Sequence, residues 1–166
     1  MTANRLLTAA LDYLSNGWSV IPCLPGEKKP ALKWEPYQER RPTEDEIRQW
    51  WGKWPTANVA IVTGIISGLT VIDVDGADGI QSSRQIKVPS TRVIKTPHGF
   101  HLYFAYSPDF HTGAGFLPGI DVRNDGGYVI APPSTVDGTA YNILRDRLVV
   151  PIELTPDAFT ARHRNG

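Results

Sequence analysis

The sequence predicts an α+β fold. Three observations support this class: two amphipathic helix patterns stand in the first third of the chain, strand patterns fill the chain from Asn58 onward, and glycine and proline separate those strands. The chain has 166 residues, of which 41% are hydrophobic. It is therefore large enough for one domain with a core, or for two small lobes that share a site.

The first expected helix lies near the N-terminus. Leucine and alanine recur there at three- and four-residue spacing from Leu6 to Leu14, and Asn16-Gly17 is typical of a helix end. A short strand over Trp18–Pro22 and a loop over residues 25–36 are expected to follow.

The second expected helix begins near Thr43 and ends before Pro55, because Thr43 and Glu46 have the spacing of a capping box. Its apolar face carries an isoleucine and three tryptophans, which are Ile47, Trp50, Trp51 and Trp54. We interpret this face as one that packs on a sheet, and a platform for stacking nucleobases is the alternative.

The remaining chain is expected to form a mostly antiparallel sheet. The candidate strands are Val59–Thr63, Leu69–Val74, Thr91–Lys95, His101–Ala105, Gly119–Arg123, Tyr128–Ala131 and Ala140–Ile143. Residues 78–87 fit either a short helix or a loop. The composition after Pro151 is typical of the exit from a domain, so residues 156–166 are interpreted as the start of a linker or tail.

Composition narrows the classes of function. Lysine plus arginine and aspartate plus glutamate number 17 each, so nucleic-acid binding would depend on a local basic patch. Lys28, Lys29 and Lys33 form such a patch and are candidate contacts for template DNA, with a solvated surface loop as the alternative.

Cysteine content and hydropathy exclude other classes. Cys23 is the only cysteine, which excludes an internal disulfide and a cysteine-rich zinc site. The N-terminus has no apolar signal-peptide region, and no apolar run approaches the ~20 residues of a membrane span. We expect a soluble, cytoplasmic protein with no membrane partner.

Polar residues stand in phase on three expected strands. Residues two apart in a strand share a face, so Asp73 and Asp75 oppose Ile72 and Val74, and Asp121 and Arg123 oppose Ile120 and Val122. His101 similarly opposes Leu102 and Phe104. Solvated surface aspartates and a structural histidine are the alternatives for each strand taken alone.

Three carboxylates on one sheet face would repel one another and raise one another's pKa unless a cation lies among them. Oxygen ligands favour hard cations such as Mg²⁺ or Mn²⁺. Two such ions about 3.5–4 Å apart can activate an attacking hydroxyl and stabilise a leaving phosphate oxygen. The pattern therefore predicts a two-metal site for nucleotide addition, with no zinc.

A loop between two of these strands, from Lys95 to His101, could hold a triphosphate. Its lysine, threonine and histidine side chains supply donors, and Gly99 would let backbone N–H groups approach closely. It is not a Walker loop, and an ordinary hairpin turn is the alternative. Arg123 shares the face of Asp121 and could pair with phosphate oxygens.

Four motifs occur in a fixed order along the chain. They are the Gly-x-Lys-x-Pro loop at Gly26–Pro30, the acidic strand Val71–Asp75, the Thr-Pro-x-Gly-x-His turn at Thr96–His101, and the stretch Gly119–Ser134 with its Gly-Ile-Asp-Val-Arg and Tyr-Val-Ile-Ala-Pro-Pro-Ser strands. From about Leu6 to Pro151 this order resembles the primase-polymerase (Prim-Pol) branch of the archaeo-eukaryotic primase superfamily. The chain departs from that pattern at His98, where a serine is common, and it lacks the cysteines of the zinc-binding stem that some relatives carry.

The resemblance implies roles for the site residues. Asp73, Asp75 and Asp121 would be catalytic metal ligands for two Mg²⁺ or Mn²⁺ ions. His101 would act with them and, with Lys95, Thr96 and Arg123, would contact the phosphates of the incoming nucleotide. The turn residues His98 and Gly99 are assigned to the same nucleotide-binding site, and the role of His98 stays open.

The resemblance also implies a fold and partners. A single catalytic domain would be an archaeo-eukaryotic primase-like core, with an α/β N-terminal lobe over about 1–65 packed on a C-terminal lobe like an RNA-recognition motif over 66–155. Its partners would be a single-stranded DNA template, a primer, and NTPs or dNTPs. A helical region and a helicase would be joined to it in a longer replication protein.

We therefore expect a DNA primase-polymerase that catalyses template-directed nucleotidyl transfer in DNA replication. The alternatives are a metal-dependent nuclease or phosphoesterase, which would use the same carboxylates, and a non-catalytic module that binds single-stranded nucleic acid. The sequence leaves open the metal, the nucleotide class, the template preference, the oligomeric state and a viral, plasmid or cellular source.

Overall fold

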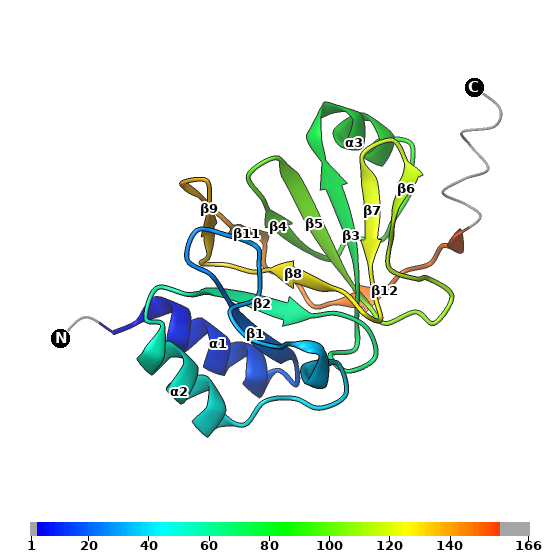
Figure 1. Cartoon of the computed structure of the whole chain (residues 1–166). Coiled ribbons are helices and arrows are strands. Elements are labelled where there is room, and N and C mark those ends of the chain that lie inside the picture. Colours follow the sequence, from blue (N-terminus) through cyan, green and yellow to red (C-terminus); the bar gives the residue numbers. More distant parts are fainter. Residues whose placement is uncertain (1–2, 157–166) are drawn as a thin grey trace.

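The computed structural model describes residues 3–156 and confirms the α+β class, with mostly antiparallel sheets (Figure 1). The helices are α1 (Arg5–Ser15), α2 (Glu44–Lys53) and α3 (Gly76–Ser83), with a 3-10 helix over Glu35–Gln38. The strands are β1 (Ser19–Cys23), β2 (Asn58–Val62), β3 (Leu69–Asp75), β4 (Arg92–Lys95), β5 (Gly99–Ala105), β6 (Gly113–Leu117), β7 (Ile120–Arg123), β8 (Tyr128–Ile130), β9 (Thr135–Val136), β10 (Thr139–Ala140), β11 (Asn142–Arg145) and β12 (Val150–Pro151).

The first sheet has the antiparallel order β1-β2-β8 and carries α1 and α2 on the side drawn below it in Figure 1. β1 and β2 are buried along their whole length, because side chains on both of their faces are covered. The strand β8 belongs to this sheet although it lies within the expected range 66–155 of the second lobe. The chain therefore returns to the first sheet after it has built most of the second.

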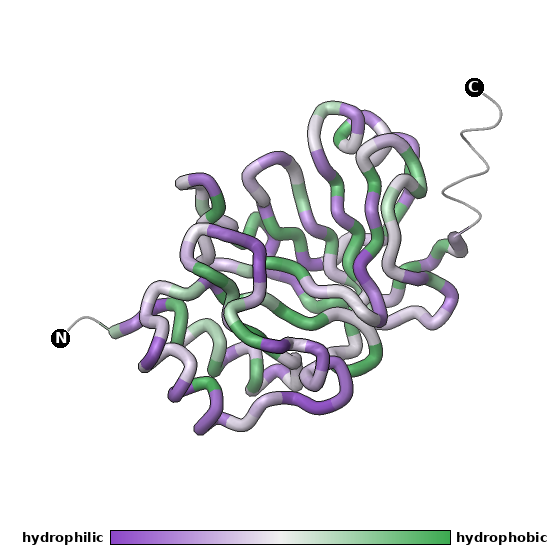
Figure 2. Tube along the Cα trace, viewed as in Figure 1, coloured by the Kyte–Doolittle hydropathy of each residue, from purple (hydrophilic) through white to green (hydrophobic). Residues whose placement is uncertain are grey.

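The second sheet has the order β11-β4-β5-β3-β7-β6, and β12 pairs in parallel with the end of β5. Figure 2 shows hydrophilic and hydrophobic residues alternating along its central strands. On one face, Ile72 and Val74 join a small core with residues of β7 and α3. On the other face, Leu69 and Val71 join the larger core, which also contains the buried residues of the first sheet and of α1 and α2.

The face of β3 that meets the first sheet changes in character along the strand. Leu69 and Val71 are fully buried, Asp73 is half-buried and Asp75 is exposed. Because these four residues share one face, the same surface passes from hydrophobic core to polar site within a single strand. The site is thereby placed where the two sheets diverge.

Helix α2 begins as the sequence predicts. Thr43 Oγ1 accepts the N–H of Glu46, and the Glu46 carboxylate accepts the N–H of Thr43, which completes a capping box. Trp51 is only 2% exposed, and its indole N–H donates to the carbonyl of Ala57. Trp50 and Trp54 pack against the same core, so the face is a packing face and the stacking-platform alternative is wrong for Trp51.

Glu46 also receives two hydrogen bonds from the Arg40 guanidinium and one from the Tyr37 hydroxyl. The Arg40 contact is the main cause that lowers the pKa of Glu46 from 4.5 to about 2. A lowered pKa stabilises the folded state above the unfolded value, and that stabilisation is lost as pH falls through the folded value. We expect Glu46→Gln, which keeps the cap but removes the charge, to lower Tm at neutral pH by at most about 4 °C, for a cost of about 1 kcal/mol or less.

The Tm difference between Glu46→Gln and wild type should shrink as pH falls from above 4.5 toward about 2. Thermal unfolding followed by circular dichroism across this range measures it. Glu44→Gln is the matched control, since the Glu44–Arg48 pair is more exposed and should matter less. A Tm difference that stays constant with pH would show that the charge of Glu46 is not what stabilises the helix start.

The structure resolves or adjusts several expected elements. Residues 78–87 fall partly in α3, which begins at Gly76, directly after β3. The expected strand Ala140–Ile143 is divided between β10 and β11, and β6, β9 and β12 were not expected from the sequence. Of the expected tail, residues 157–166 lie outside the described range. No helix within residues 3–156 has the length and hydropathy needed to cross a membrane.

Candidate active site

Three predicted site residues form one row across adjacent strands. In the sheet register, Asp73 of β3 lies opposite Asp121 of β7 on one side and opposite His101 of β5 on the other. Arg123 lies opposite Val71, two residues along, and therefore on the same face. The prediction that these polar residues share one sheet face is confirmed.

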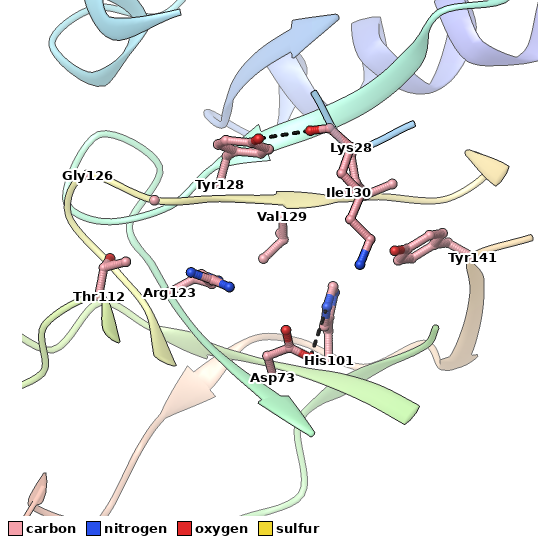
Figure 3. A pocket seen from close by; sticks show the side chains of 11 residues that line it. Lys28, Asp73, His101, Thr112, Arg123, Gly126, Tyr128, Val129, Ile130 and Tyr141 are labelled. Carbon is pink, nitrogen blue, oxygen red and sulfur yellow. Dashed lines mark hydrogen bonds and ion pairs between the residues drawn. The ribbon is translucent and has the colours of Figure 1, made fainter. Parts of the chain in front are cut away.

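A pocket of about 230 Å³ lies between this face and β8 of the first sheet (Figure 3). The residues that line it are Lys28, Asp73, His101, Thr112, Arg123, Gly126, Gly127, Tyr128, Val129, Ile130 and Tyr141. Asp73 and His101 form one wall, and Val129 and Ile130 of β8 lie across from them. Both sheets therefore contribute to a single concave site.

Asp73 lies among cations of the protein itself. Its Oδ1 is 3.5 Å from Nε2 of His101, and burial alone would raise its pKa. The contact with His101 and the charges of Arg123 and Lys28 outweigh burial, and the pKa of Asp73 is lowered below its usual range. The expected rise from crowded carboxylates is therefore wrong for this residue, because the neighbouring positive charges dominate.

The other two carboxylates, Asp75 and Asp121, are not among the described residues that line the pocket. Asp121 Oδ2 is 3.8 Å from Nη2 of Arg123, and its Oδ1 accepts the backbone N–H of Gly115. Asp75 is exposed and lies opposite Gly99 in the register. As the side chains stand, residues 3–156 contain no group of three histidine, cysteine, aspartate or glutamate residues that could hold one metal ion.

Lys28 lines the pocket, although it was expected to contact DNA with Lys29 and Lys33. Its loop is fixed by hydrogen bonds from Tyr128 Oη to the carbonyl of Lys28 (2.8 Å) and from Asn58 Nδ2 to the carbonyl of Glu27 (2.9 Å). Figure 3 shows the Lys28 ammonium directed toward the side of the pocket where His101 lies. Lys29 and Lys33 are exposed and do not line the pocket.

The expected triphosphate turn joins β4 to β5, and the register of these strands places its residues. Lys95 lies opposite Phe100, so the register places it on the sheet face away from His101, and the structure does not bring it into the site. The N–H of Thr96 donates to the carbonyl of Gly99, which closes the hairpin. A Cβ at Gly99 would collide with the carbonyl oxygen of Val74, so glycine is required by the close pairing of β5 with β3.

His98 is exposed, and its carbonyl accepts the N–H of Gly76. Neither His98, Thr96 nor Gly99 lines the pocket between the two sheets in the described part of the chain. Their assignment to nucleotide binding stays a prediction, and it would need the nucleotide to extend beyond the pocket toward the hairpin.

The family model described as "Bifunctional DNA primase/polymerase, N-terminal" matches residues 10–158. The chain belongs to this family. Membership implies nucleotidyl transfer of the primase/polymerase type. No curated protein matches the chain.

Sequence reasoning missed two residues of this primase/polymerase domain that matter for the site. One holds the site together, and the other faces into it. The first is Asn124, which is fully buried next to Arg123. Its Nδ2 donates to the carbonyls of Ser107 and Phe110 at 2.9 and 2.7 Å, and its Oδ1 accepts the hydroxyl of Thr70 at 3.1 Å. These bonds join β3 to the loop before β6. The sequence did not reveal this role, because the stretch Asn-Asp-Gly-Gly that begins at Asn124 indicates only a turn.

The second missed residue is Tyr141, between β10 and β11. Its ring lies 5.9 Å from that of His101, centroid to centroid, and it is 2% exposed. Burial, with the charges of Asp73 and Asp75, raises the pKa of Tyr141 to about 12, so the hydroxyl stays protonated. No local sequence signal distinguishes it from a core tyrosine, because its position depends on long-range pairing.

Proposed function

We propose that the domain catalyses template-directed nucleotidyl transfer from NTPs or dNTPs in DNA replication, by a two-metal mechanism. The observation that supports the proposal is the row Asp121–Asp73–His101 on one sheet face, beside a pocket. Two positively charged residues, Lys28 and Arg123, also line that pocket. Carboxylates beside cations suit a substrate that brings both divalent ions and a polyphosphate.

Asp73, Asp75 and Asp121 are the residues that would hold Mg²⁺ or Mn²⁺. Their donor chemistry fits, because all three are carboxylates on one sheet face and two are direct register partners. As they stand, Asp73 is paired with His101 and Asp121 with Arg123, so metal binding would require them to turn from these partners. When bound, the ions would supply charge neutralisation and a more acidic attacking hydroxyl.

The side chains of the protein would position the reactants. Lys28, His101 and Arg123 would bind the oxygens of the triphosphate and orient the α-phosphorus toward the primer 3′-hydroxyl, whose attack releases pyrophosphate. Val129 and Ile130 of β8 would exclude water from the other side of the pocket. In this proposal the protein accelerates the reaction mainly by orienting the reactants and by stabilising negative charge on the phosphates.

The arrangement of the second sheet supports the proposed RNA-recognition-motif-like lobe. Its central strands are antiparallel in the order β4-β5-β3-β7, and α3 packs near one face with Ile80 against the small core. We extend the proposal to the partners, which would be a single-stranded template, a primer, and a helical region and helicase in a longer protein.

A primer-extension assay tests the function. A labelled primer on a longer template would be incubated with the protein, Mg²⁺ or Mn²⁺, and either NTPs or dNTPs. We expect extension by single nucleotides that depends on metal and template. Cleavage of labelled DNA by protein and metal without nucleotides would instead favour the nuclease alternative, and metal-independent binding without extension would favour the non-catalytic module.

Lys28 and Lys29 offer a matched pair of variants. Because only Lys28 lines the pocket, we expect Lys28→Gln to raise the nucleotide KM about tenfold or more, through loss of a charge-assisted phosphate contact of about 1.5–3 kcal/mol. Lys29→Gln, which removes an equal charge one residue away, should leave that KM nearly unchanged. Equal effects of both variants on DNA affinity, with no change in nucleotide KM, would restore the original assignment of Lys28 to the DNA-binding patch.

A further inference from the structure

Tyr141 presents an unused hydrogen-bond donor to the pocket. The residue is only 2% exposed, and its hydroxyl makes no hydrogen bond to another side chain or to the backbone within residues 3–156. The backbone N–H of Tyr141 donates to the carbonyl of Ser134 at 2.8 Å, which fixes the residue at the junction of the two sheets. The hydroxyl is not among the described side-chain atoms that are sealed from solvent without a partner, so it is open to the pocket that Tyr141 lines, where a ligand can accept its hydrogen bond.

The hydroxyl converges with two other donors. Tyr141, Lys28 and His101 all line the pocket, and Figure 3 shows the Tyr141 oxygen and the Lys28 ammonium pointing toward each other above His101. An ammonium, an imidazole and a phenol hydroxyl that stays protonated are all hydrogen-bond donors that suit an anion with several acceptor oxygens. The ring face of Tyr141 is covered, which leaves only the hydroxyl to contact a ligand.

We propose that the Tyr141 hydroxyl binds the polyphosphate tail of the incoming nucleotide, as the third donor of a group with Lys28 and His101. The inference rests on the proposed function and adds a substrate-contacting residue to it. A contact with the nucleobase by stacking is disfavoured because the ring is not exposed. The experiment must therefore distinguish a contact with the phosphates from a contact with the sugar.

Tyr141→Phe removes only the oxygen and keeps the packing of the ring on His101. Because the hydroxyl has no protein partner, Tm should not fall. Calorimetric titration with inorganic tripolyphosphate and, separately, with a dNTP, both with Mg²⁺, should show binding about tenfold weaker for each ligand. Tyr106→Phe is the matched control, because its hydroxyl donates to Asp125 outside the pocket, and it should bind both ligands as wild type does.

Four results would overturn the inference. Unchanged tripolyphosphate binding by Tyr141→Phe, together with an altered preference between NTPs and dNTPs, would place the hydroxyl on the sugar. A lower Tm for Tyr141→Phe would show a structural role. If wild type binds neither tripolyphosphate nor a dNTP, the proposed function fails as well. If wild type binds both ligands and Tyr141→Phe binds them equally well, only the role of Tyr141 is refuted.

Discussion

Replacing Asp73 with asparagine is expected to reduce nucleotide addition by about a thousandfold or more. Asp73 stands at the centre of the row Asp121–Asp73–His101, and a metal ligand there would contribute several kcal/mol of charge stabilisation in the transition state. Each ~1.4 kcal/mol changes the rate about tenfold. Single-turnover primer extension at saturating metal and nucleotide measures the loss.

The stability of Asp73→Asn gives an independent readout. The surrounding cations favour the charged carboxylate, so Tm without added metal should be no higher than that of wild type. Asp109→Asn, at an exposed position outside the pocket, is the control and should keep wild-type extension and Tm. Near-normal extension by Asp73→Asn would show that this carboxylate holds no catalytic metal.

Replacing Asn124 with alanine is expected to destabilise the domain by about 3 kcal/mol. The change removes three hydrogen bonds of a fully buried side chain, to the carbonyls of Ser107 and Phe110 and the hydroxyl of Thr70, and each such bond contributes about 1 kcal/mol. For a domain of this size, Tm should fall by about 6–12 °C. Thermal or urea-induced unfolding followed by circular dichroism checks the value.

Asn142→Ala is the matched control for that experiment. Asn142 is exposed, and its side chain makes only a long contact of 3.5 Å to the carbonyl of Ala140, so its removal should change stability by no more than about 0.5 kcal/mol. Asn124→Ala should also slow extension, because Asn124 directly follows Arg123 and its hydrogen bonds help to hold the site together. A fully stable Asn124→Ala would mean that water replaces all three bonds.

Much of the fold follows from local patterns in the sequence. The capping box of α2 and the alternation in β3, β5 and β7 are properties of neighbouring residues, so they predict elements and faces without knowledge of the partner strands. The strand β6 was missed because its sequence, Gly-Ala-Gly-Phe-Leu, lacks alternation and its pairing with β7 is irregular. Two-residue strands such as β9 leave no periodic signal at all.

The site was predictable only where it depends on strand alternation. The common face of Asp73, His101 and Asp121 follows from a period of two, whereas the side taken by Lys95 depends on the register of the hairpin that joins β4 to β5. The place of Lys28 is set by a hydrogen bond to Tyr128, one hundred residues away in the chain. Contacts of such separation leave no mark in local sequence.

The return of β8 to the first sheet has a consequence for dissecting the protein. A fragment ending at residue 65 would contain β1 and β2 but would lack β8, which pairs with β2 through Ala60, Ile61 and Val62. Its buried strand β2 would become a bare, apolar edge, which is a surface prone to intermolecular pairing and aggregation. The first sheet is thus built from segments that are distant in sequence. A split version of the protein would therefore have to be cut at a place where the two pieces can still pair β2 with β8.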